Sequence, residues 1–217
     1  MTGVQTCALP ISEDDRVKSP QVLIDVYYRS VGRNCVFLLN VPPDERGLFH
    51  DTDIAVLREF RRILDETFAV NLAAGKPVQI SGDATVAMAS HRGQHPYFAP
   101  ANIVDGDPQT YWATDDGVTS ASLEIDLGAP KHFDRVLLQE PIRFGHRIAA
   151  FAIEARVDGT WQEISRATTI GYKRLLRIDP VTADRVRIVI EDSVSTPALS
   201  GFGLFEASAS EGGDFPS

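Results

Sequence analysis

Cysteine is scarce in this sequence: Cys7 and Cys35 are the only two among 217 residues. Two cysteines give no disulfide framework, and they lack the spacing of a metal-binding pair. Basic residues are also in the minority, since 21 Lys and Arg face 30 Asp and Glu, a net charge of −9. Nucleic acids and anionic membranes require a basic face, so the charge argues against both as partners but not against neutral sugars. No apolar run approaches the roughly 20 residues that span a bilayer.

The sequence also lacks an internal repeat and a long Gly/Ser linker. Its first residues, "MTGVQTCALPIS", have no periodicity, no basic segment and too short an apolar core for a signal peptide. We interpret residues 1–12 as a sequencing artefact and exclude them from the fold reasoning. The natural N-terminus is therefore expected to be missing, and the beginning of the chain carries no information on localisation.

Residues 13–73 have the pattern helix, strand, helix. In "PQVLIDVYYRSVGRN" apolar side chains recur at helical spacing, and "DTDIAVLREFRRILDETF" is an amphipathic helix that Asp51 or Thr52 is expected to cap. Between them "CVFLLNV" is a continuous apolar run, short enough for a strand buried on both faces. Such a unit belongs to a parallel α/β sheet or barrel, so we interpret 13–73 as an α/β stub.

Residues 74–208 have a different pattern, in which short alternating segments are separated by Gly, Pro or Asp. The segments are "ASLEIDLG", "FDRVLLQE", "AAFAIEARVDG", "WQEISRATTI", "RLLRID" and "DRVRIVIED". Their regular spacing predicts a mainly β fold, an antiparallel β-sandwich or jelly roll. Trp112 is expected in its core, and Trp161, after a hairpin turn, in partly exposed packing. Residues 209–217 are expected to be a disordered tail.

The stretch "ANIVDGDPQTYW" has two interpretations. Asp105 and Gly106 suit a β-turn that binds nothing. The same turn can gather oxygen ligands for calcium, which prefers carboxylates and backbone carbonyls. The candidate ligands are the Asp105 carboxylate, the carbonyls of Asn102 and Asp107, and Thr110.

Over Gly93–Ala207 the chain resembles the coagulation factor 5/8 type C (discoidin-like) domain, which is close to carbohydrate-binding module family 32 and has a galactose-binding-like fold. The matching stretches are "ANIVDGDPQTYWATDD", "LEIDLGAPKHFDRVLLQE", "FAIEARVDGTWQEI", "RVRIVIEDS" and "SGFGLFEA". Many members hold a structural calcium ion in the first loop. The resemblance implies as its ligands Asn102 (carbonyl), Asp105, Asp107, Thr110, Phe205 (carbonyl) and Glu206. The ion is then expected to clip the loop to the last strand, a stabilising role.

Two polar and aromatic clusters are candidate sugar-binding residues. "HRGQHPYF" supplies His95, and "EPIRFGHR" supplies Arg143, His146 and Arg147. The alternative is an interdomain surface, where the arginines bridge carboxylates of a neighbouring domain. Because "PIRFGHRI" resembles the version of this domain fused to fucosidases, we favour packing on a catalytic barrel over free glycan binding. The histidines include no i, i+4 pair on a helix, so a zinc site has weak support.

The stub resembles the end of the catalytic (β/α)8 barrel of glycoside hydrolase family 29, the α-L-fucosidases. The most specific stretch is "NCVFLLNVPPDERGLFHDTDIAVLREF". The resemblance implies a retaining enzyme with a carboxylate nucleophile and a second carboxyl group as acid/base, both on earlier strands that this chain lacks. Asn40 is expected either at the active-site mouth or satisfying a loop, and Asp44 and Glu45 as solvated turn charges.

Together these resemblances predict the non-catalytic C-terminal part of an enzyme that releases terminal α-L-fucose from glycans. The expected partners are fucosylated glycans, reached through the parent enzyme, and the missing N-terminal barrel. The expected cofactor is structural Ca²⁺, with none for catalysis, and the expected localisation is secreted or periplasmic. The alternatives are a stand-alone carbohydrate-binding or adhesion module and a purely structural brace. Alone, the chain is expected to expose the run 35–41 as an unpaired apolar edge and to associate.

Overall fold

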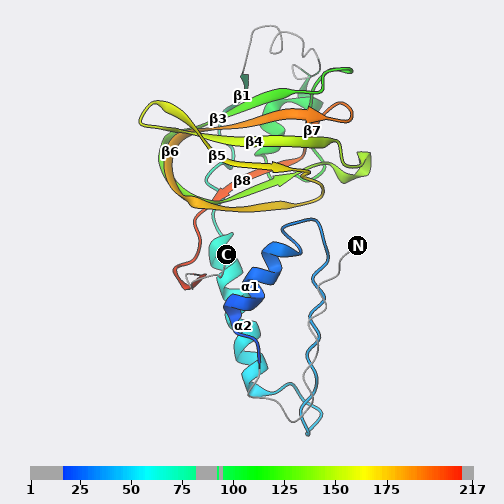
Figure 1. Ribbon diagram of the computed structural model, residues 1–217, viewed down its shortest axis with the longest axis vertical. Helices are drawn as coiled ribbons and strands as arrows, with labels where there is room; N and C mark the ends of the chain where they lie inside the picture. Colours follow the sequence, from blue (N-terminus) through cyan, green and yellow to red (C-terminus); the bar gives the residue numbers. More distant parts are fainter. Residues whose placement is uncertain (1–16, 82–91, 93–94, 212–217) are drawn as a thin grey trace. The chain divides into compact units, whose positions relative to one another are not determined.

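The computed structural model describes residues 17–81, 92 and 95–211 and divides the chain into two compact units (Figure 1). One unit, here called the helical unit, comprises residues up to 69 together with the segment from 207 onward. The other, here called the sandwich, comprises 70–206. The sequence-based boundary at 73/74 therefore lies four residues away from the one between the units.

The helical unit contains two α-helices. Helix α1 (Pro20–Arg29) begins at Ser19, whose side chain accepts a hydrogen bond from the amide of Val22, and Pro20 occupies the first turn, where its missing N–H costs nothing. Helix α2 (Asp51–Thr67) begins at His50, whose Nδ1 accepts from the amide of Thr52. The prediction that Asp51 or Thr52 caps this helix is therefore wrong, because the histidine ring reaches the free amide first.

The two helices pack through a small apolar core. Leu23, Ile24 and Tyr28 of α1 and Ile63 of α2 are buried. Around them the Phe60 ring meets the rings of Tyr27 and Phe37 edge-on, each with centroids 6.2 Å apart. Among the described residues, no helix is long and apolar enough to cross a membrane.

The run 35–41 does not form the predicted strand. It has no regular strand assignment, and Val36 and Leu38 are 81% and 71% exposed. A strand forms only when neighbouring backbones satisfy its amide and carbonyl groups, and the part of the helical unit that the structure describes offers this run no sheet to join. The prediction that this run exposes apolar side chains is confirmed for Val36 and Leu38.

The segment after 206 corrects a second prediction. Residues 209–217 were expected to be disordered, but Ala209–Glu211 form a 3-10 turn, η6, in the helical unit. Thr67 and Glu211 are both buried, and the hydroxyl of Thr67 donates to the carboxylate of Glu211 at 3.2 Å. Ser208 donates from its amide to the Thr67 hydroxyl and from its own hydroxyl to Glu66. These contacts fix the segment on α2; 212–217 lie outside the described residues.

The sandwich is antiparallel, as predicted. Its strands are β1 (Val78–Ser81), β2 (Trp112–Ala113), β3 (Ala121–Gln139), β4 (Ile148–Val157), β5 (Thr160–Thr168), β6 (Arg174–Ser193), β7 (Ala198–Leu199) and β8 (Gly201–Phe205). The main sheet has the order β1-β3-β6-β4-β5, with β8 paired to β3, and β2 pairs separately with β7. Short 3-10 turns, η3 (Pro96–Phe98), η4 (Pro100–Ile103) and η5 (Ile142–Phe144), lie between strands.

Strands β3 and β6 form one long bent ribbon. They pair from Ala121↔Ile190 to Asp126↔Arg185 and again from Lys131↔Ala183 to Leu138↔Arg174, with a register shift between the two stretches. Gly128, with φ of 79°, lies at this bend. The first half of β3 joins β1 and the second half of β6 joins β4, whereas the second half of β3 joins β8, so one ribbon contributes to both layers. We call the bend the closed end of the sandwich, and the opposite end, where 139–148 and 193–200 lie, the open end.

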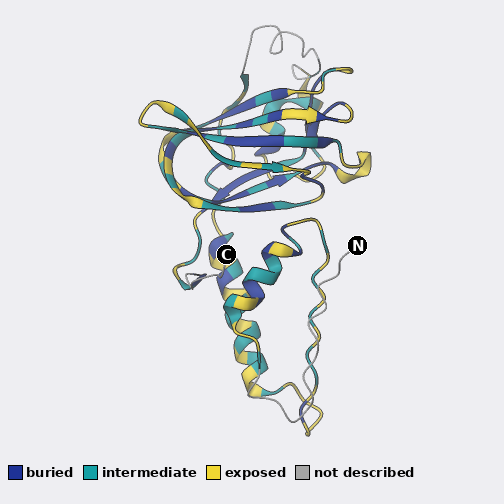
Figure 2. Ribbon diagram, in the orientation of Figure 1, coloured by how far each residue is buried: buried dark blue, intermediate teal, exposed yellow. Residues whose placement is uncertain are grey.

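The core lies between the two layers. Alternate residues of β3, β4 and β6 are buried, and Figure 2 shows the buried stretches along these strands. Trp112 is 0% exposed, as predicted for a core residue. Trp161 is half-buried under Arg187, whose guanidinium carbon lies 3.9 Å from the ring centroid. The hairpin turn before Trp161 is also confirmed, with Asp158 and Gly159 both at positive φ.

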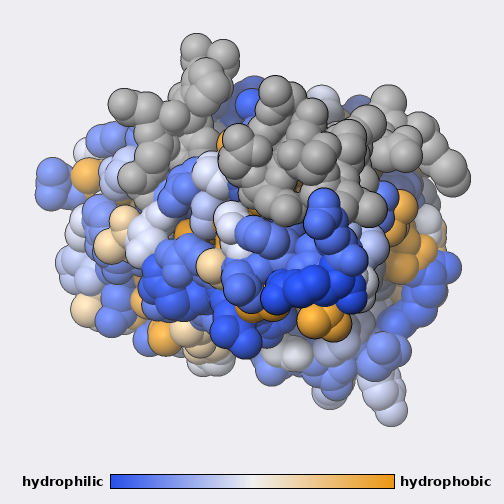
Figure 3. All heavy atoms as spheres, turned by 90° about the horizontal axis from the view of Figure 1, so that it is seen from below, coloured by the Kyte–Doolittle hydropathy of each residue, from blue (hydrophilic) through white to orange (hydrophobic). Residues whose placement is uncertain are grey.

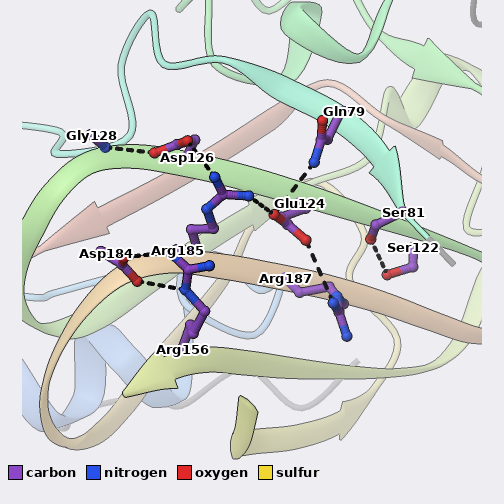
Figure 4. A network of polar contacts seen from close by, with 10 residues as sticks. All are labelled: Gln79, Ser81, Ser122, Glu124, Asp126, Gly128, Arg156, Asp184, Arg185 and Arg187. Atoms are coloured by element: carbon purple, nitrogen blue, oxygen red, sulfur yellow. Dashed lines mark hydrogen bonds and ion pairs between the residues drawn. The ribbon is translucent and has the colours of Figure 1, made fainter. Parts of the chain in front are cut away.

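A network of ion pairs crosses the outer face of β3, β4 and β6 (Figure 4). Glu124 is only 7% exposed, and its carboxylate pairs with Arg185 and Arg187. Arg185 also pairs with Asp126 at 3.0 Å, and Arg187 with Glu154 at 3.1 Å. The charges of this face thus neutralise one another. From a different direction, below the view of Figure 1, hydrophilic residues predominate on the coloured part of the surface and hydrophobic ones form small separate patches (Figure 3).

Gly203 in β8 gives a prediction about packing. A Cβ atom there would lie 2.6 Å from Cε2 of Phe205, whose side chain is buried, whereas at Gly201 it would meet the flexible end of Gln139. We expect Gly203→Ala to lower the free energy of unfolding by about 1–3 kcal/mol and Gly201→Ala to cost less. Urea unfolding followed by tryptophan fluorescence measures this, because both tryptophans lie in the sandwich. Equal midpoints for the two variants would contradict it.

Candidate functional site

The loop between η4 and β2 is closed by its own side chains. The carboxylate of Asp105 accepts from the amide of Asp107 at 2.8 Å and from the hydroxyl of Thr110 at 2.7 Å. The Thr110 hydroxyl is also 2.9 Å from the carbonyl of Asp107, and Gly106 adopts φ of 80°. The amide of Asn102 donates to the carbonyls of Pro96 and Tyr111. The structure thus brings Asp105, Asp107 and Thr110 together in a compact turn of hard oxygen atoms.

The remaining predicted calcium ligands come from the end of β8. Phe205 is buried and Glu206 exposed, and β8 packs beside η4, so both halves of the predicted ligand set lie in the same region of the sandwich. Among the described residues no three His, Cys, Asp or Glu side chains are grouped as metal ligands. The carboxylates of Asp105, Asp107 and Glu206 are therefore not assembled around a common centre, and a cation here depends on carbonyl oxygens as well. The donor chemistry fits calcium.

At the open end, aromatic rings and guanidinium groups alternate. We call Phe98, Tyr111, Arg143, Phe144 and Arg147 the open-end cluster. The Tyr111 ring meets Phe98 and Phe144 edge-on, with centroids 5.4 and 5.2 Å apart. The guanidinium carbon of Arg143 lies 5.1 Å from the Tyr111 centroid and 5.0 Å from that of Phe144, and that of Arg147 lies 5.3 Å from Phe144. The two sequence clusters therefore meet, and Tyr111 joins them.

The guanidinium groups of this cluster are held by neutral acceptors. Arg143 donates to the backbone carbonyl of Gln109 at 2.9 Å and to its side-chain oxygen at 3.3 Å. Arg147 donates to the carbonyl of Thr196 at 3.0 Å. Because Gln109 lies between Asp107 and Thr110, Arg143 connects the cluster directly to the candidate calcium loop.

Next to the cluster, Arg92 has a carboxylate partner instead. Its guanidinium pairs with Asp116 at 2.9 Å, and this hydrogen bond holds the pKa of the Asp116 carboxyl below its usual range. The Arg92 guanidinium also lies 5.5 Å from the Phe98 centroid. The charge of Arg92 is thus already balanced within the sandwich.

Glu140 fixes the loop that carries the two cluster arginines. It is 2% exposed, and its carboxylate accepts from the backbone amides of Arg147 (2.8 Å), Ile148 (3.1 Å) and Gly171 (2.7 Å). A buried carboxylate is tolerated only when such donors replace water. Glu140 therefore ties the loop of η5 and the loop before β6 to the end of β3.

The other predicted sugar-binding residues lie in different places. His95 is exposed, stacks on Tyr97 with centroids 5.1 Å apart, and accepts from the Tyr97 amide. His146 is exposed in the Arg143–Arg147 loop. Asn40 is exposed in the helical unit, so the predicted set does not form one site within the sandwich.

Asp44 corrects a further expectation. It was expected to be a solvated turn charge, but it is only 7% exposed. Its carboxylate accepts from the amides of Arg46 and Leu48 and from the Arg46 guanidinium, whose hydrogen bond lowers the pKa of Asp44. The residue organises its own turn, which explains its burial; Glu45 beside it is exposed.

Sequence reasoning missed the residues that hold these loops. The side chain of Asn71 bonds the backbone of Phe202 and Leu204, securing the start of the sandwich to β8. Gln109 was not singled out, and Glu140 was noted only as part of a polar cluster. A buried carboxylate or amide resembles a surface residue in a single sequence, so no local pattern pointed to these three.

The fold and the loops of the open end define a galactose-binding-like β-sandwich. The F5/8 type C domain model matches residues 85–201, and the chain belongs to that family.

Relatives extend the similarity to nearly the whole chain. Alpha-L-fucosidase 1 of Arabidopsis thaliana is 37% identical over 187 residues, 84% of this chain, and the chain spans only 35% of that relative's length. A family 29 fucosidase of Ruminococcus gnavus, solved in complex with fucose, is 35% identical with a TM-score of 0.80, over 89% of this chain and 38% of that one. A chitosan-binding module from a Paenibacillus sp. chitosanase/glucanase shares the fold alone, with 21% identity, a TM-score of 0.52, and coverage of 62% and 97%.

The Glu140 clamp yields a stability prediction. Hydrogen bonds to a charged acceptor contribute about 1.5–3 kcal/mol each, so we expect Glu140→Gln to lower the free energy of unfolding by about 2 kcal/mol or more. Amide hydrogen exchange at Arg147, Ile148 and Gly171 should accelerate. Glu154→Gln is the matched control, because that carboxylate is partly exposed and its loss should cost about 1 kcal/mol or less. Unchanged exchange at the three amides would refute the role of Glu140.

Proposed function

We propose that this chain is the C-terminal part of an α-L-fucosidase that removes terminal α-L-fucose from glycans. The observation that carries the proposal is the similarity to fucosidases across both units, not only across the sandwich. An unrelated protein that shared only the sandwich would match 70–206 alone. The exposed Val36 and Leu38 also support it, because a catalytic barrel would supply the neighbouring strands that these side chains lack.

In this proposal the chain performs no chemistry by itself. A retaining glycosidase requires two carboxyl groups about 5–5.5 Å apart, and we assign neither role to an acidic residue of this chain. The sandwich acts as an accessory domain that packs on the barrel and binds carbohydrate. The second candidate, a stand-alone binding module, is favoured by the exposed Arg143 and Phe144 of the open-end cluster, which would serve a free module equally well.

A chimera tests the fucosidase proposal. This chain replaces the corresponding part of the Ruminococcus gnavus fucosidase, and release of nitrophenol from 4-nitrophenyl α-L-fucoside is measured. We expect the chimera to be active, the chain alone to be inactive, and a chimera ending at residue 69 to melt at a lower temperature. If the full chimera melts no higher than the chimera that ends at residue 69, the sandwich does not stabilise the parent enzyme. If the full chimera folds but is inactive, the fucosidase proposal as a whole is contradicted.

We further propose that the loop Asn102–Thr110 binds calcium together with Phe205 and Glu206. Support comes from the hard oxygen atoms of Asp105, Asp107 and Thr110 and from the packing of β8 beside η4. The ion would add positive charge where Asp105 and Glu206 supply negative charge, and would tie the loop to the end of the sandwich. Its role is stabilisation.

Calcium binding makes a measurable prediction. After treatment with a chelator, added calcium should raise the melting temperature of the full chain, since a ligand at a hundredfold excess over its Kd stabilises the folded state by about 2.7 kcal/mol. Asp105→Ala should abolish this response. Asp158→Asn, in the exposed hairpin turn at the closed end, should retain it. A response that persists in Asp105→Ala would place the ion elsewhere, and no response in the parent chain would rule the site out.

A further inference from the structure

Ion pairing sets two arginines of the sandwich apart from many of the others. Many of its arginines are paired with carboxylates: Arg92, Arg135, Arg156, Arg166, Arg185 and Arg187. Arg143 and Arg147 differ. Within the part of the chain that the structure describes, neither forms an ion pair, and their contacts are carbonyl and amide oxygens and aromatic rings. Two guanidinium groups without an ion-pair partner therefore lie near one ring, on a chain whose net charge is −9.

These two charges are held in place. The Phe144 ring lies 5.0 Å from the guanidinium carbon of Arg143 and 5.3 Å from that of Arg147, so one ring supports both groups. Gln109 fixes Arg143 from the side of the calcium loop, and buried Glu140 fixes the backbone at Arg147. Guanidinium groups that are ordered before binding lose little conformational entropy when they bind an anion.

The surroundings indicate what kind of anion fits. Phe144 is 39% exposed and Tyr111 half-buried, and aromatic rings of this kind accept the apolar face of a sugar. Guanidinium groups bind carboxylates through paired, charge-assisted hydrogen bonds. A ligand that satisfies both has a pyranose ring for the aromatic side chains and a carboxylate for the arginines.

We propose that the open-end cluster binds a sugar that bears a carboxylate, such as a uronic acid, with Arg143 and Arg147 recognising the charged group and Phe144 with Tyr111 the ring. This deepens the proposed carbohydrate-binding role of the sandwich and rests on it. The competing occupant is an acidic surface of the catalytic barrel. The exposed Phe144 favours the sugar, because a purely ionic contact would not require an aromatic ring.

Calorimetric titration of the full chain with trigalacturonic acid and with the neutral galactotriose tests the proposal. We expect the acid to bind at least about tenfold more tightly than the neutral sugar, a difference that shrinks as salt is raised. Arg143→Gln and Arg147→Gln should each weaken binding of the acid about tenfold. Arg143→Lys should have an intermediate effect, because lysine keeps the positive charge but cannot donate the paired hydrogen bonds of a planar guanidinium group. Melting temperatures show whether each variant remains folded.

Lys131→Gln is the matched control, since it removes one positive charge at the closed end, away from the cluster. It should leave binding unchanged. Equal affinity for both sugars would overturn the acidic-sugar proposal while supporting neutral carbohydrate binding. If neither sugar binds, the sugar proposal fails. If Arg143→Gln then also lowers the melting temperature of the fucosidase chimera, the cluster is an interdomain surface. The activity of the chimera decides separately on the fucosidase proposal.

Discussion

The bent pairing of β3 with β6 is the constraint on which the rest of the sandwich depends. The two strands pair on both sides of the bend, and their register fixes which residues face the core. Because the ribbon folds back on itself, Ala121 and Gln139 lie at the same end although they begin and finish one strand. The connections that follow β3, β5 and β6 therefore all arrive at the open end. The bend thus places the loop of Arg143, Phe144 and Arg147 at the open end, where it meets Phe98 of η3 and Tyr111.

Glu140 holds two loops of the open end in fixed positions on the strands. It directly follows β3, and it bonds amides of the η5 loop and of the loop before β6. Desolvating a carboxylate is unfavourable, and three amide donors offset that cost only while both loops keep their positions. The same arrangement leaves Arg143 free to reach Gln109. The buried Glu140 carboxylate thus orders the loop of the cluster, and the groups that the cluster presents are guanidinium groups and aromatic rings.

The sequence predicted the sandwich well because its signals are local. Alternation along "LEIDL" and "RVRIVI" specifies strands, Asp158 and Gly159 specify a hairpin turn, and Trp112 is apolar in a strand that needs a core residue. Two of the predictions that failed depend on distant partners. The run 35–41 has strand composition but no sheet to join, and residues 209–211 have a polar composition but a buried Glu211 against Thr67. Nor does spacing reveal that Tyr111 joins two sequence clusters.

The contrast between the sheet face and the open end bears most directly on function. On the sheet face Arg185 and Arg187 share the carboxylate of Glu124, and each has a second acidic partner. In such a network the acidic and basic groups neutralise one another, so the sheet face presents little net charge to a ligand. At the open end the carboxylate of Glu140 accepts hydrogen bonds from backbone amides, and among the described residues the guanidinium groups of Arg143 and Arg147 form no ion pair. On a chain with more carboxylates than basic groups, two arginines that share one aromatic ring and form no ion pair are the observation on which the proposal of an acidic ligand rests.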